Sequence, residues 1–233
     1  MTAGDPGGVR EAWEGEAESW IRFCAEPDVF AWRFNIPAFL ELLPPPGRLT
    51  VDVGCGEGRV ARELIKAGHE VVGIDGSATL VEAARRGEPA VDARHADAAD
   101  LPLHDGSADL VVSFMTLQSI DDLEGAIGEA ARVLRPGGQL AFAIVHPMNS
   151  VEEAPDYYTP KAYAYAHERD GVDFTFHDAH RPLSAYCAAL ETAGLVTETL
   201  NEPVPGPALL EVQPQAERWT RTPCFLHVRA RKP

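Results

Sequence analysis

A glycine-rich turn between a predicted strand and a predicted helix is the strongest chemical signal in the chain. The segment reads Asp52-Val53-Gly54-Cys55-Gly56-Glu57-Gly58 and leads from an apolar, β-branched run into a helical pattern. Glycines let the backbone adopt φ > 0 and approach a ligand with no Cβ in the way. Ligands of open α/β sheets bind beyond the carboxyl ends of the strands. The turn therefore predicts a nucleotide-type cofactor site, although tight strand-to-helix geometry alone could also require these glycines.

Two features distinguish a dinucleotide from a cofactor with a cationic centre. They are the spacing of the glycines and the carboxylates near them. The dinucleotide fingerprint GxGxxG would need its third glycine at position 59, where the chain has Arg59. A pyrophosphate also favours a free helix N-terminus, and the carboxylates of Asp52 and Glu57 would oppose an anion there. They suit instead a ligand with a cationic centre and an ammonium group. A nucleotide-dependent oxidoreductase is thus the weaker alternative.

Acidic residues also follow the next two predicted strands. Asp75, which precedes Gly76 and Ser77, ends the second strand and can accept hydrogen bonds from both hydroxyls of a ribose. A carboxylate that only caps the next helix is the alternative interpretation. After the third strand, Asp97 can accept from an exocyclic amine while the neighbouring amide of Ala98 faces the ring.

The elements that must position these residues alternate between short apolar runs and helical patterns, which predicts βαβ units on a parallel sheet. The predicted strands of this middle zone are Leu49–Val53, Val71–Asp75, Val91–His95, Ala108–Phe114 and Gln139–Val145. The predicted helices are Arg59–Ala67, Ala78–Arg86 and Leu123–Leu134. Before them, helix-like stretches cover Glu11–Ala25 and Val29–Leu43; after them come a helix at Leu183–Ala193 and strands at Leu195–Leu200 and Cys224–Arg229.

Together these segments resemble the class I S-adenosylmethionine-dependent methyltransferases, over about residues 20 to 147. The turn Asp52–Gly58 corresponds to the first family motif, Asp75 to the ribose acid, and Asp97-Ala98 to the adenine-binding pair. The tail after His180 resembles that of small-molecule members of the type 11 and ubiquinone/menaquinone group. The resemblance implies a doubly wound, Rossmann-like α/β fold with seven strands in the order 3-2-1-4-5-7-6, strand seven being antiparallel.

The resemblance also implies the organisation of the chain and its ligands. One domain would comprise an N-terminal helical cap (1–47), a cofactor-binding core (48–147), a lid and acceptor segment (148–183) and a C-terminal helix with strands (184–233). The cofactor would be S-adenosyl-L-methionine. Its expected contacts are Trp20, Asp52, Gly54, Cys55, Gly56, Gly58, Asp75, Gly76, Ser77, Asp97, Ala98, Phe114 and Met115.

Two histidines are candidates for a general base that removes a proton from the acceptor. His146 ends the fifth predicted strand, beside the expected methyl position, and an unperturbed histidine pKa of about 6.5 suits this task. It could equally shape only the turn before Pro147. His180 is the second candidate, in a region that closes over the acceptor in the family. His177 and His180 could share a helix face, but no third metal ligand is evident, so no metal is predicted.

Composition limits the partners. Lys and Arg total 20 against 36 Asp and Glu, a formal net charge of −16, which disfavours a nucleic-acid substrate. No apolar run reaches the ~20 residues of a membrane span. Without an evident signal peptide, and with four widely spaced cysteines, a cytoplasmic protein with reduced thiols is expected. The resemblance implies an acceptor pocket beside the N-terminal helices and the segment after the fifth strand. The aromatic residues of these zones are Trp13, Trp20, Phe23, Phe30, Trp32, Phe34, Tyr157, Tyr158, Tyr163, Tyr165, Phe174 and Phe176.

Three functions remain open from the residues alone. The first is methyl transfer to an O, N or C atom of a small-molecule acceptor, by a monomer or homodimer. The second is a cofactor-binding fold relative that performs other chemistry, such as a cyclisation. The third is a nucleotide-dependent oxidoreductase or a non-catalytic binding module.

Overall fold

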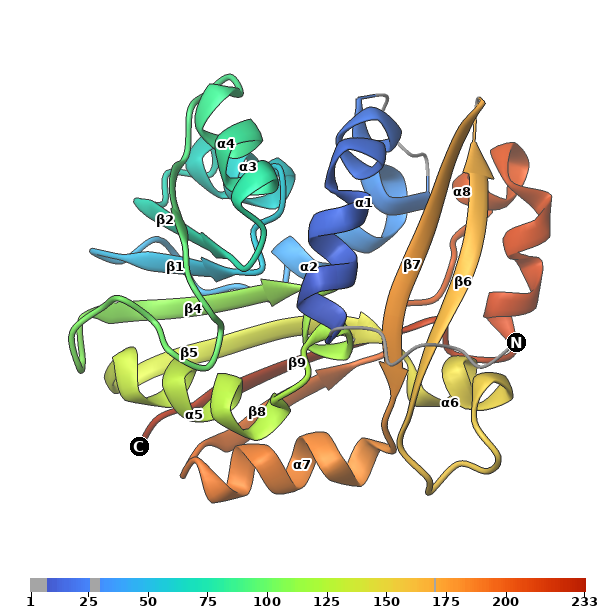
Figure 1. Cartoon of the computed structure of the whole chain (residues 1–233). Coiled ribbons are helices and arrows are strands. Elements are labelled where there is room, and N and C mark those ends of the chain that lie inside the picture. The colour runs from blue at the N-terminus through green and yellow to red at the C-terminus, as the bar shows by residue number, and fades with distance from the viewer. Residues whose placement is uncertain (1–7, 26–29, 170) are drawn as a thin grey trace.

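A seven-stranded sheet forms the centre of the computed structural model, which describes residues 8–25, 30–169 and 171–233 (Figure 1). Its strands, in spatial order, are β3 (Asp92–His95), β2 (Val71–Asp75), β1 (Thr50–Val53), β4 (Ala108–Phe114), β5 (Leu134–Val145), β9 (Phe225–Arg231) and β8 (Val196–Asn201). The first five are parallel, and β9 pairs antiparallel with both β5 and β8. This is the predicted order, with β9 as the seventh strand, so the predicted fold class is confirmed.

Helices cover both faces of the sheet. In Figure 1, α3 (Arg59–Lys66) and α4 (Ala78–Arg86) lie above the strands, and α5 (Leu123–Val133) and α7 (Leu183–Thr192) lie below. Alternate residues of a strand point to opposite faces. On β4, Val111 joins the core beneath α5, whereas Leu110 and Val112 join the core beneath α3. A strand buried on both faces needs a nearly continuous apolar run, which is why the middle zone of the sequence has this pattern.

A second sheet, a two-stranded antiparallel hairpin, stands apart from the first. It comprises β6 (Lys161–Arg169) and β7 (Val172–His180), and β7 packs against α1 (Val9–Cys24), as Figure 1 shows. The sequence predicted a lid over residues 148–183 but no strands within it. The signal for strands was nonetheless present, because Tyr163, Tyr165 and His167 alternate with small or polar residues at the period of a strand.

The remaining elements are short. The second N-terminal helix was predicted at Val29–Leu43; the structure has a π-helical turn at Ala31–Asn35 followed by α2 (Ile36–Leu40), and residues 26–29 lie outside the described residues. The other short elements are 3-10 turns at Leu117–Ser119, Val151–Glu153 and Pro214–Thr220 and the helices α6 (Pro147–Ser150) and α8 (Pro207–Val212). No helix in the described part of the chain is both long and apolar enough to cross a membrane.

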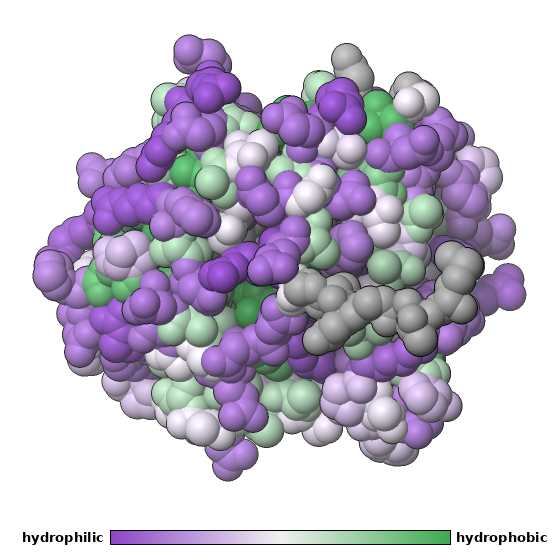
Figure 2. All heavy atoms as spheres, in the orientation of Figure 1, coloured by the Kyte–Doolittle hydropathy of each residue, from purple (hydrophilic) through white to green (hydrophobic). Residues whose placement is uncertain are grey.

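The outer surface is polar, in keeping with the net charge. Figure 2 shows a face made mostly of hydrophilic residues, with hydrophobic ones in small separate groups. The large hydrophobic side chains gather instead in the cores on the two faces of the sheet.

Candidate functional site

A large cavity of about 1510 Å³ opens at the carboxyl ends of the parallel strands. The chain runs outward from β1 to β2 and β3 in one direction and through β4 and β5 in the other, so this edge is the topological switch point of the sheet. The opposite walls of the cavity come from α1, the β6–β7 hairpin and the turn Pro214–Thr220. The predicted contacts that line it are Trp20, Asp52, Gly54, Cys55, Gly56, Asp75, Gly76, Asp97, Ala98, Phe114 and Met115.

Two predicted cofactor contacts lie outside the cavity lining and have packing roles. Gly58, at φ +90°, begins α3, and an added Cβ would lie 2.8 Å from an Arg62 nitrogen and 3.1 Å from Val91. Ser77 is buried, and its hydroxyl caps α4 by accepting from the backbone N–H of Leu80 at 3.1 Å. These two residues shape the turns on which the lining residues sit.

The first two glycines of the turn differ in what surrounds them. Both have positive φ, +75° for Gly54 and +55° for Gly56, which favours glycine. A Cβ on Gly54 would lie 2.0 Å from the Thr116 side chain, whose hydroxyl donates to the Gly54 carbonyl at 3.1 Å. A Cβ on Gly56 would meet only the Trp20 indole nitrogen, at 3.7 Å. Gly54 therefore permits internal packing, whereas Gly56 presents bare backbone to the cavity.

Asp75 ties two of the turns together. One carboxylate oxygen accepts from the backbone N–H of Gly56 and the other from that of Ser77, each at 2.8 Å. Burial raises the pKa of this carboxyl, and the two N–H donors partly offset the rise. Each oxygen keeps further acceptor capacity, so the side chain can also accept from a diol in the cavity.

Asp52 is a buried carboxyl without an ion pair among the described residues. Only 1% of its surface is exposed, and neither oxygen makes a hydrogen bond of normal geometry with any described residue. Burial, and then the negative charges of Asp75 and Glu57, raise its pKa to about 7, and the N–H of Ala61 offsets this rise only in part. A buried acid without a partner is costly, because it must remain protonated or await a positive charge. Together with the open backbone of Gly56, it fits a ligand that carries a cationic group.

Glu57, in contrast, has partners within the protein. Its carboxylate accepts from the indole N–H of Trp20 at 3.1 Å and from Arg59 at 2.9 Å, and burial raises its pKa to about 7. The Arg59 guanidinium lies 4.9 Å from the centre of the Trp20 ring. This group attaches α1 to the glycine-rich turn, and both Glu57 and Arg59 line the cavity. The Glu57 carboxylate was expected to suit a cationic ligand but was not among the expected contacts, and Arg59 was assigned no role at the cofactor.

The N-terminal helix also covers the far end of the sheet edge. Arg10 of α1 donates to one oxygen of Asp97 at 3.0 Å, and the other oxygen accepts from the backbone N–H of Ala99 at 2.9 Å. The Arg10 side chain also crosses Gly76, where an added Cβ would lie 3.0 Å from its aliphatic carbons. Asp97 therefore lines the cavity as predicted, but one of its two oxygens already has a cationic partner.

His146 does not occupy the position predicted for a general base. It is 5% exposed and is not among the cavity-lining residues. Its Nδ1 accepts from the backbone N–H of Met148 at 3.0 Å and thereby caps α6. The proton must then sit on Nε2, which faces a carboxylate oxygen of Glu202 at 2.9 Å. No ring lone pair remains for a substrate proton, so the structure favours the turn-shaping alternative.

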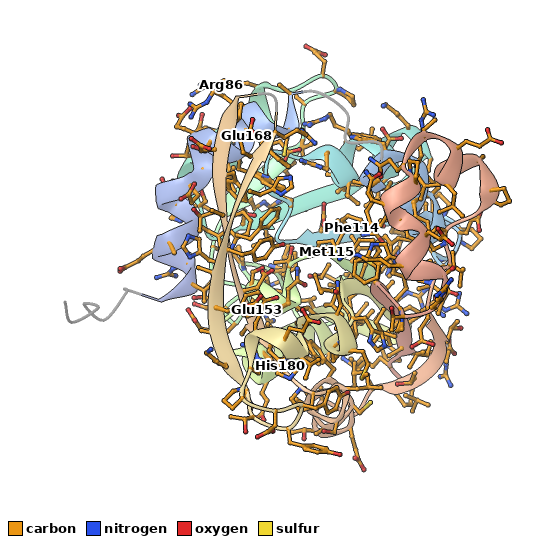
Figure 3. All side chains as sticks on the ribbon, turned by 90° about the vertical axis from the view of Figure 1, so that its right-hand side faces the viewer. Arg86, Phe114, Met115, Glu153, Glu168 and His180 are labelled. Atoms are coloured by element: carbon orange, nitrogen blue, oxygen red, sulfur yellow. The ribbon has the colours of Figure 1, made fainter. Side chains whose placement is uncertain are left out.

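His180, the second candidate base, is also held at both ring nitrogens. It is fully buried, and its Nε2 lies 3.0 Å from the backbone carbonyl of Tyr157. A carbonyl accepts only, so Nε2 carries the proton and Nδ1 accepts from the Ser150 hydroxyl at 2.8 Å. In Figure 3, His180 lies at the lower end of the hairpin, well separated from Phe114 and Met115. It packs the base of the hairpin and does not line the cavity.

The wall opposite the sheet edge combines aromatic residues that were expected near the acceptor with polar residues that were not. One face of the hairpin lines the cavity with Tyr163, Tyr165, His167, Arg169, Phe176 and Asp178. Asp178 was not a predicted site residue, yet it is 2% exposed and accepts a hydrogen bond from Ser119, which also lines the cavity. Of the aromatic residues expected around the acceptor, Trp13, Trp20, Phe23, Phe30, Tyr163, Tyr165 and Phe176 line the cavity.

The described residues contain no group of three or more His, Cys, Asp or Glu side chains placed to hold a metal ion. All four cysteines, Cys24, Cys55, Cys187 and Cys224, are free thiols.

Known proteins with similar sequences point to one family. A family model described as a methyltransferase domain matches residues 51–142. A probable S-adenosylmethionine-dependent methyltransferase of Mycolicibacterium smegmatis is 34% identical over 65% of this chain and 53% of its own length. Nocamycin O-methyltransferase of Saccharothrix syringae is 35% identical over 67% of this chain and 62% of its own. The chain thus spans little more than half the length of these curated relatives.

Solved structures agree on the fold. An S-adenosylmethionine-dependent methyltransferase from Mesorhizobium loti is 26% identical, with a TM-score of 0.66 over 84% of this chain and 96% of that one. The cyclase SpnF has the same TM-score over 99% of both chains at 20% identity, a likeness that shows the fold alone.

Proposed function

Because this chain belongs to the class I S-adenosylmethionine-dependent methyltransferases, we propose that it transfers a methyl group from S-adenosylmethionine to a small-molecule acceptor. The acceptor atom would be O, N or C. The observation that carries the proposal is the combination of two features at the switch point of the sheet. Asp52 is buried without an ion pair or a hydrogen bond of normal geometry among the described residues, and the backbone of Gly56 is open to the cavity. An anionic ligand would be repelled there, whereas a cationic cofactor relieves the cost of burying the acid.

The residues of the sheet edge would divide the cofactor between them. Asp75 would accept from the ribose hydroxyls, and Asp97 with Ala98 would hold the adenine. Asp52 and the glycine-rich turn would face the cationic end. When bound, the cofactor supplies a methyl group on an already activated sulfonium.

The protein's own contribution is then positioning and exclusion of water. The helix α1 covers the edge of the sheet through Arg10, Trp20 and their acidic partners, and the hairpin closes the opposite side. Holding two reactants in line can supply a large part of a rate enhancement without any proton transfer. This is consistent with the two buried histidines, both of whose ring nitrogens are already engaged.

The proposal also covers the class of acceptor, the cellular location, the oligomeric state and the domain organisation. The net charge of −16 supports a small-molecule acceptor over a nucleic acid. The protein would act in small-molecule metabolism in the cytoplasm, as a monomer or a homodimer. We also propose that residues 1–233 work as one domain, because the N-terminal helix and the hairpin complete the cavity that the core begins.

Calorimetric titration with S-adenosylhomocysteine tests the cofactor, and an acceptor panel read by S-adenosylhomocysteine release tests the reaction. Mass spectrometry of the product then separates methyl transfer, which adds one CH₂, from an isomerising reaction such as cyclisation, which leaves the mass unchanged. A chain that binds no S-adenosylhomocysteine would refute the proposal.

A further inference from the structure

The cavity is larger than one small ligand needs. Pockets for single ligands commonly measure about 300 to 1,000 Å³, and this one measures about 1510 Å³. With the cofactor against the sheet edge, the space beside the hairpin is left for the acceptor. The chemistry of the hairpin face therefore bears directly on what the acceptor is.

A flat aromatic surface forms the middle of this face. The rings of Tyr165 and Phe176 are stacked, with centres 4.7 Å apart and planes 11° apart. Tyr163 continues the row, with its ring centre 6.1 Å from that of Tyr165 and an angle of 20° between their planes. All three rings line the cavity, and Tyr165 keeps 38% of its surface exposed. A ligand ring can pack against this row edge-to-face, or on a ring face that no neighbouring ring covers.

A buried carboxylate stands at the end of this row. Asp178 lies directly opposite Tyr163 in the register of the hairpin and lines the cavity. Burial raises the pKa of both Tyr163 and Tyr165, and the negative charges of Asp178 and Glu153 raise it further. Glu153 also lines the cavity, and Figure 3 places it between His180 and the residues Phe114 and Met115.

No described Lys or Arg forms an ion pair with Asp178. The positive charge of Arg181 acts on it, but the Arg181 guanidinium donates its hydrogen bonds to the backbone carbonyls of Leu117, Gln118 and Ile120. Among the described residues, the Asp178 carboxylate accepts one hydrogen bond, from the neutral hydroxyl of Ser119. An ionised carboxylate in this setting is under-compensated, so a cation in the cavity would be attracted to it.

The arginines of this wall lie elsewhere. Arg169 is at the other end of β6, six residues from Tyr163, or about 20 Å along an extended strand, and its guanidinium lies over the Phe23 ring at 3.9 Å. Arg218 lies over the Trp219 ring at 4.0 Å. At the end of the cavity around Asp178, the carboxylates of Asp178 and Glu153 outnumber the positive charge of Arg181, and the lining is aromatic as well.

We propose that the acceptor combines a flat ring with a protonated amine, and that Asp178 binds the amine while the ring packs on Tyr165 and Phe176. This inference rests on the proposed function, since the acceptor is defined by it. A charge-assisted hydrogen bond to a carboxylate removed from water is worth about tenfold or more in affinity. The aromatic row adds affinity that does not depend on the charge of the ligand.

Three probes that share a ring and a two-carbon chain separate these contributions. They are 2-phenylethylamine, 2-phenylethanol and phenylacetate, which are cationic, neutral and anionic at pH 7.5. Each is titrated calorimetrically into the full chain saturated with S-adenosylhomocysteine. The amine is expected to bind about tenfold or more tightly than the alcohol, and phenylacetate most weakly.

Two variants assign the preference to its residues. Asp178→Asn keeps the shape and the hydrogen bond from Ser119, and should bring the amine to within about twofold of the alcohol, because only the charge is lost. Asp173→Asn is the matched control on the exposed face of the same strand and should keep the full preference. Tyr165→Leu should weaken all three probes alike and keep the preference, because it removes ring contact and no charge.

The outcomes that overturn the inference differ from those that overturn the function. Failure of S-adenosylhomocysteine to bind the parent chain would refute the proposed function, and the inference with it. With S-adenosylhomocysteine bound, equal or tighter binding of the alcohol or the acid overturns the inference alone. So does an undiminished amine preference in a folded Asp178→Asn chain, or the absence of binding by all three probes at millimolar concentration.

Discussion

The two walls of the cavity are held in place in different ways. At the sheet edge, β1 is bonded on both sides, with Val51 opposite Val72 of β2 and Val111 of β4. The turn that follows has its shape set by backbone φ values and by the carboxylate of Asp75. The hairpin strands, in contrast, pair with each other, and their face is held by stacked rings and the packing of β7 on α1.

Because of this difference, the sheet edge can accept few substitutions, whereas the residues on the hairpin face can be exchanged more freely. A backbone-defined wall tolerates few residue types, because a left-handed glycine or a carboxylate that bonds two turns has no easy substitute. A wall defined by side chains can change its chemistry while the hairpin keeps its shape. The sheet edge is therefore suited to one fixed ligand, and the hairpin to whatever acceptor a given chain uses.

The largest effect should come from filling the bare backbone of the sheet edge. Gly56→Val places a branched side chain in the cavity at φ +55° and should weaken S-adenosylhomocysteine binding by more than about 4 kcal/mol, in effect abolishing it. Calorimetry on the folded variant measures this. Gly194→Val is the matched control: φ is +71° there and an added Cβ meets nothing within 4 Å, so it carries the strain without touching the cavity. Tight binding by Gly56→Val would mean that the ligand lies elsewhere.

The residues of the sheet edge could be chosen from the sequence for the same reason that substitutions there should be severe. Backbone conformations that only glycine adopts, and carboxylates at strand ends, leave a direct trace in residue type and spacing. Eleven of the thirteen predicted contacts line the cavity. Gly58 and Ser77 lie in the same two turns as lining residues, but they sit at the starts of α3 and α4. Which side of a turn faces the cavity is not visible in residue spacing.

The second effect concerns the stability of the hairpin, and its size depends on pH. Burial raises the pKa of Asp178 from an ordinary 3.8 to about 6, so the folded chain holds this proton more tightly than the unfolded chain. The free energy of unfolding should therefore fall as the pH rises from about 4 to about 6, and stay lower above that. Asn at this position does not titrate.

Asp178→Asn should consequently gain stability relative to the parent over this pH range, by up to about 3 kcal/mol, since one pKa unit corresponds to about 1.4 kcal/mol. Urea unfolding of both chains at pH 4, 5, 6 and 7 measures the difference. Asp173→Asn, on the exposed face of the strand, should show little change with pH. A difference between Asp178→Asn and the parent that is constant from pH 4 to 7 would mean that Asp178 does not titrate in this range.

The hairpin shows where sequence reasoning reached its limit. Aromatic residues at 163, 165 and 176 were expected near the acceptor, but their place in a cavity depends on a two-stranded sheet that pairs residues in a specific register. Asp178 was overlooked because a single acid between two histidines has no motif of its own. Its significance comes from burial and from the absence of an ion pair with any described residue, and both are tertiary properties.

A smaller effect is expected at the ribose acid. Asp75→Asn keeps the side-chain shape but cannot accept at both oxygens, so it should weaken S-adenosylhomocysteine binding by about 1.5 to 3 kcal/mol. Calorimetry on the variant tests this, with Asp92→Asn on the exposed start of the neighbouring β3 as the control. Unchanged affinity in a folded Asp75→Asn chain would leave Asp75 with only its structural role, that of joining the turns at Gly56 and Ser77.

The smallest effect on the reaction should come from His146, the residue that the sequence favoured most for chemistry. Burial lowers its pKa, which the charge of Glu202 only partly offsets, and both ring nitrogens are engaged. His146→Ala removes the cap of α6 and should cost about 1 kcal/mol of stability, whereas asparagine is itself a good cap and should cost less. Neither should change S-adenosylhomocysteine affinity.

With an acceptor identified by S-adenosylhomocysteine release, His146→Asn should keep kcat within about threefold of the parent. A general base at this position would instead contribute about 10² to 10⁴-fold. The two interpretations therefore differ by more than an order of magnitude in kcat, while thermal unfolding reports the loss of the cap independently. A hundredfold loss of kcat in His146→Asn, with its melting temperature and cofactor affinity unchanged, would restore the catalytic role. It would also require the His146 ring to leave Met148 and face the cavity when the acceptor binds.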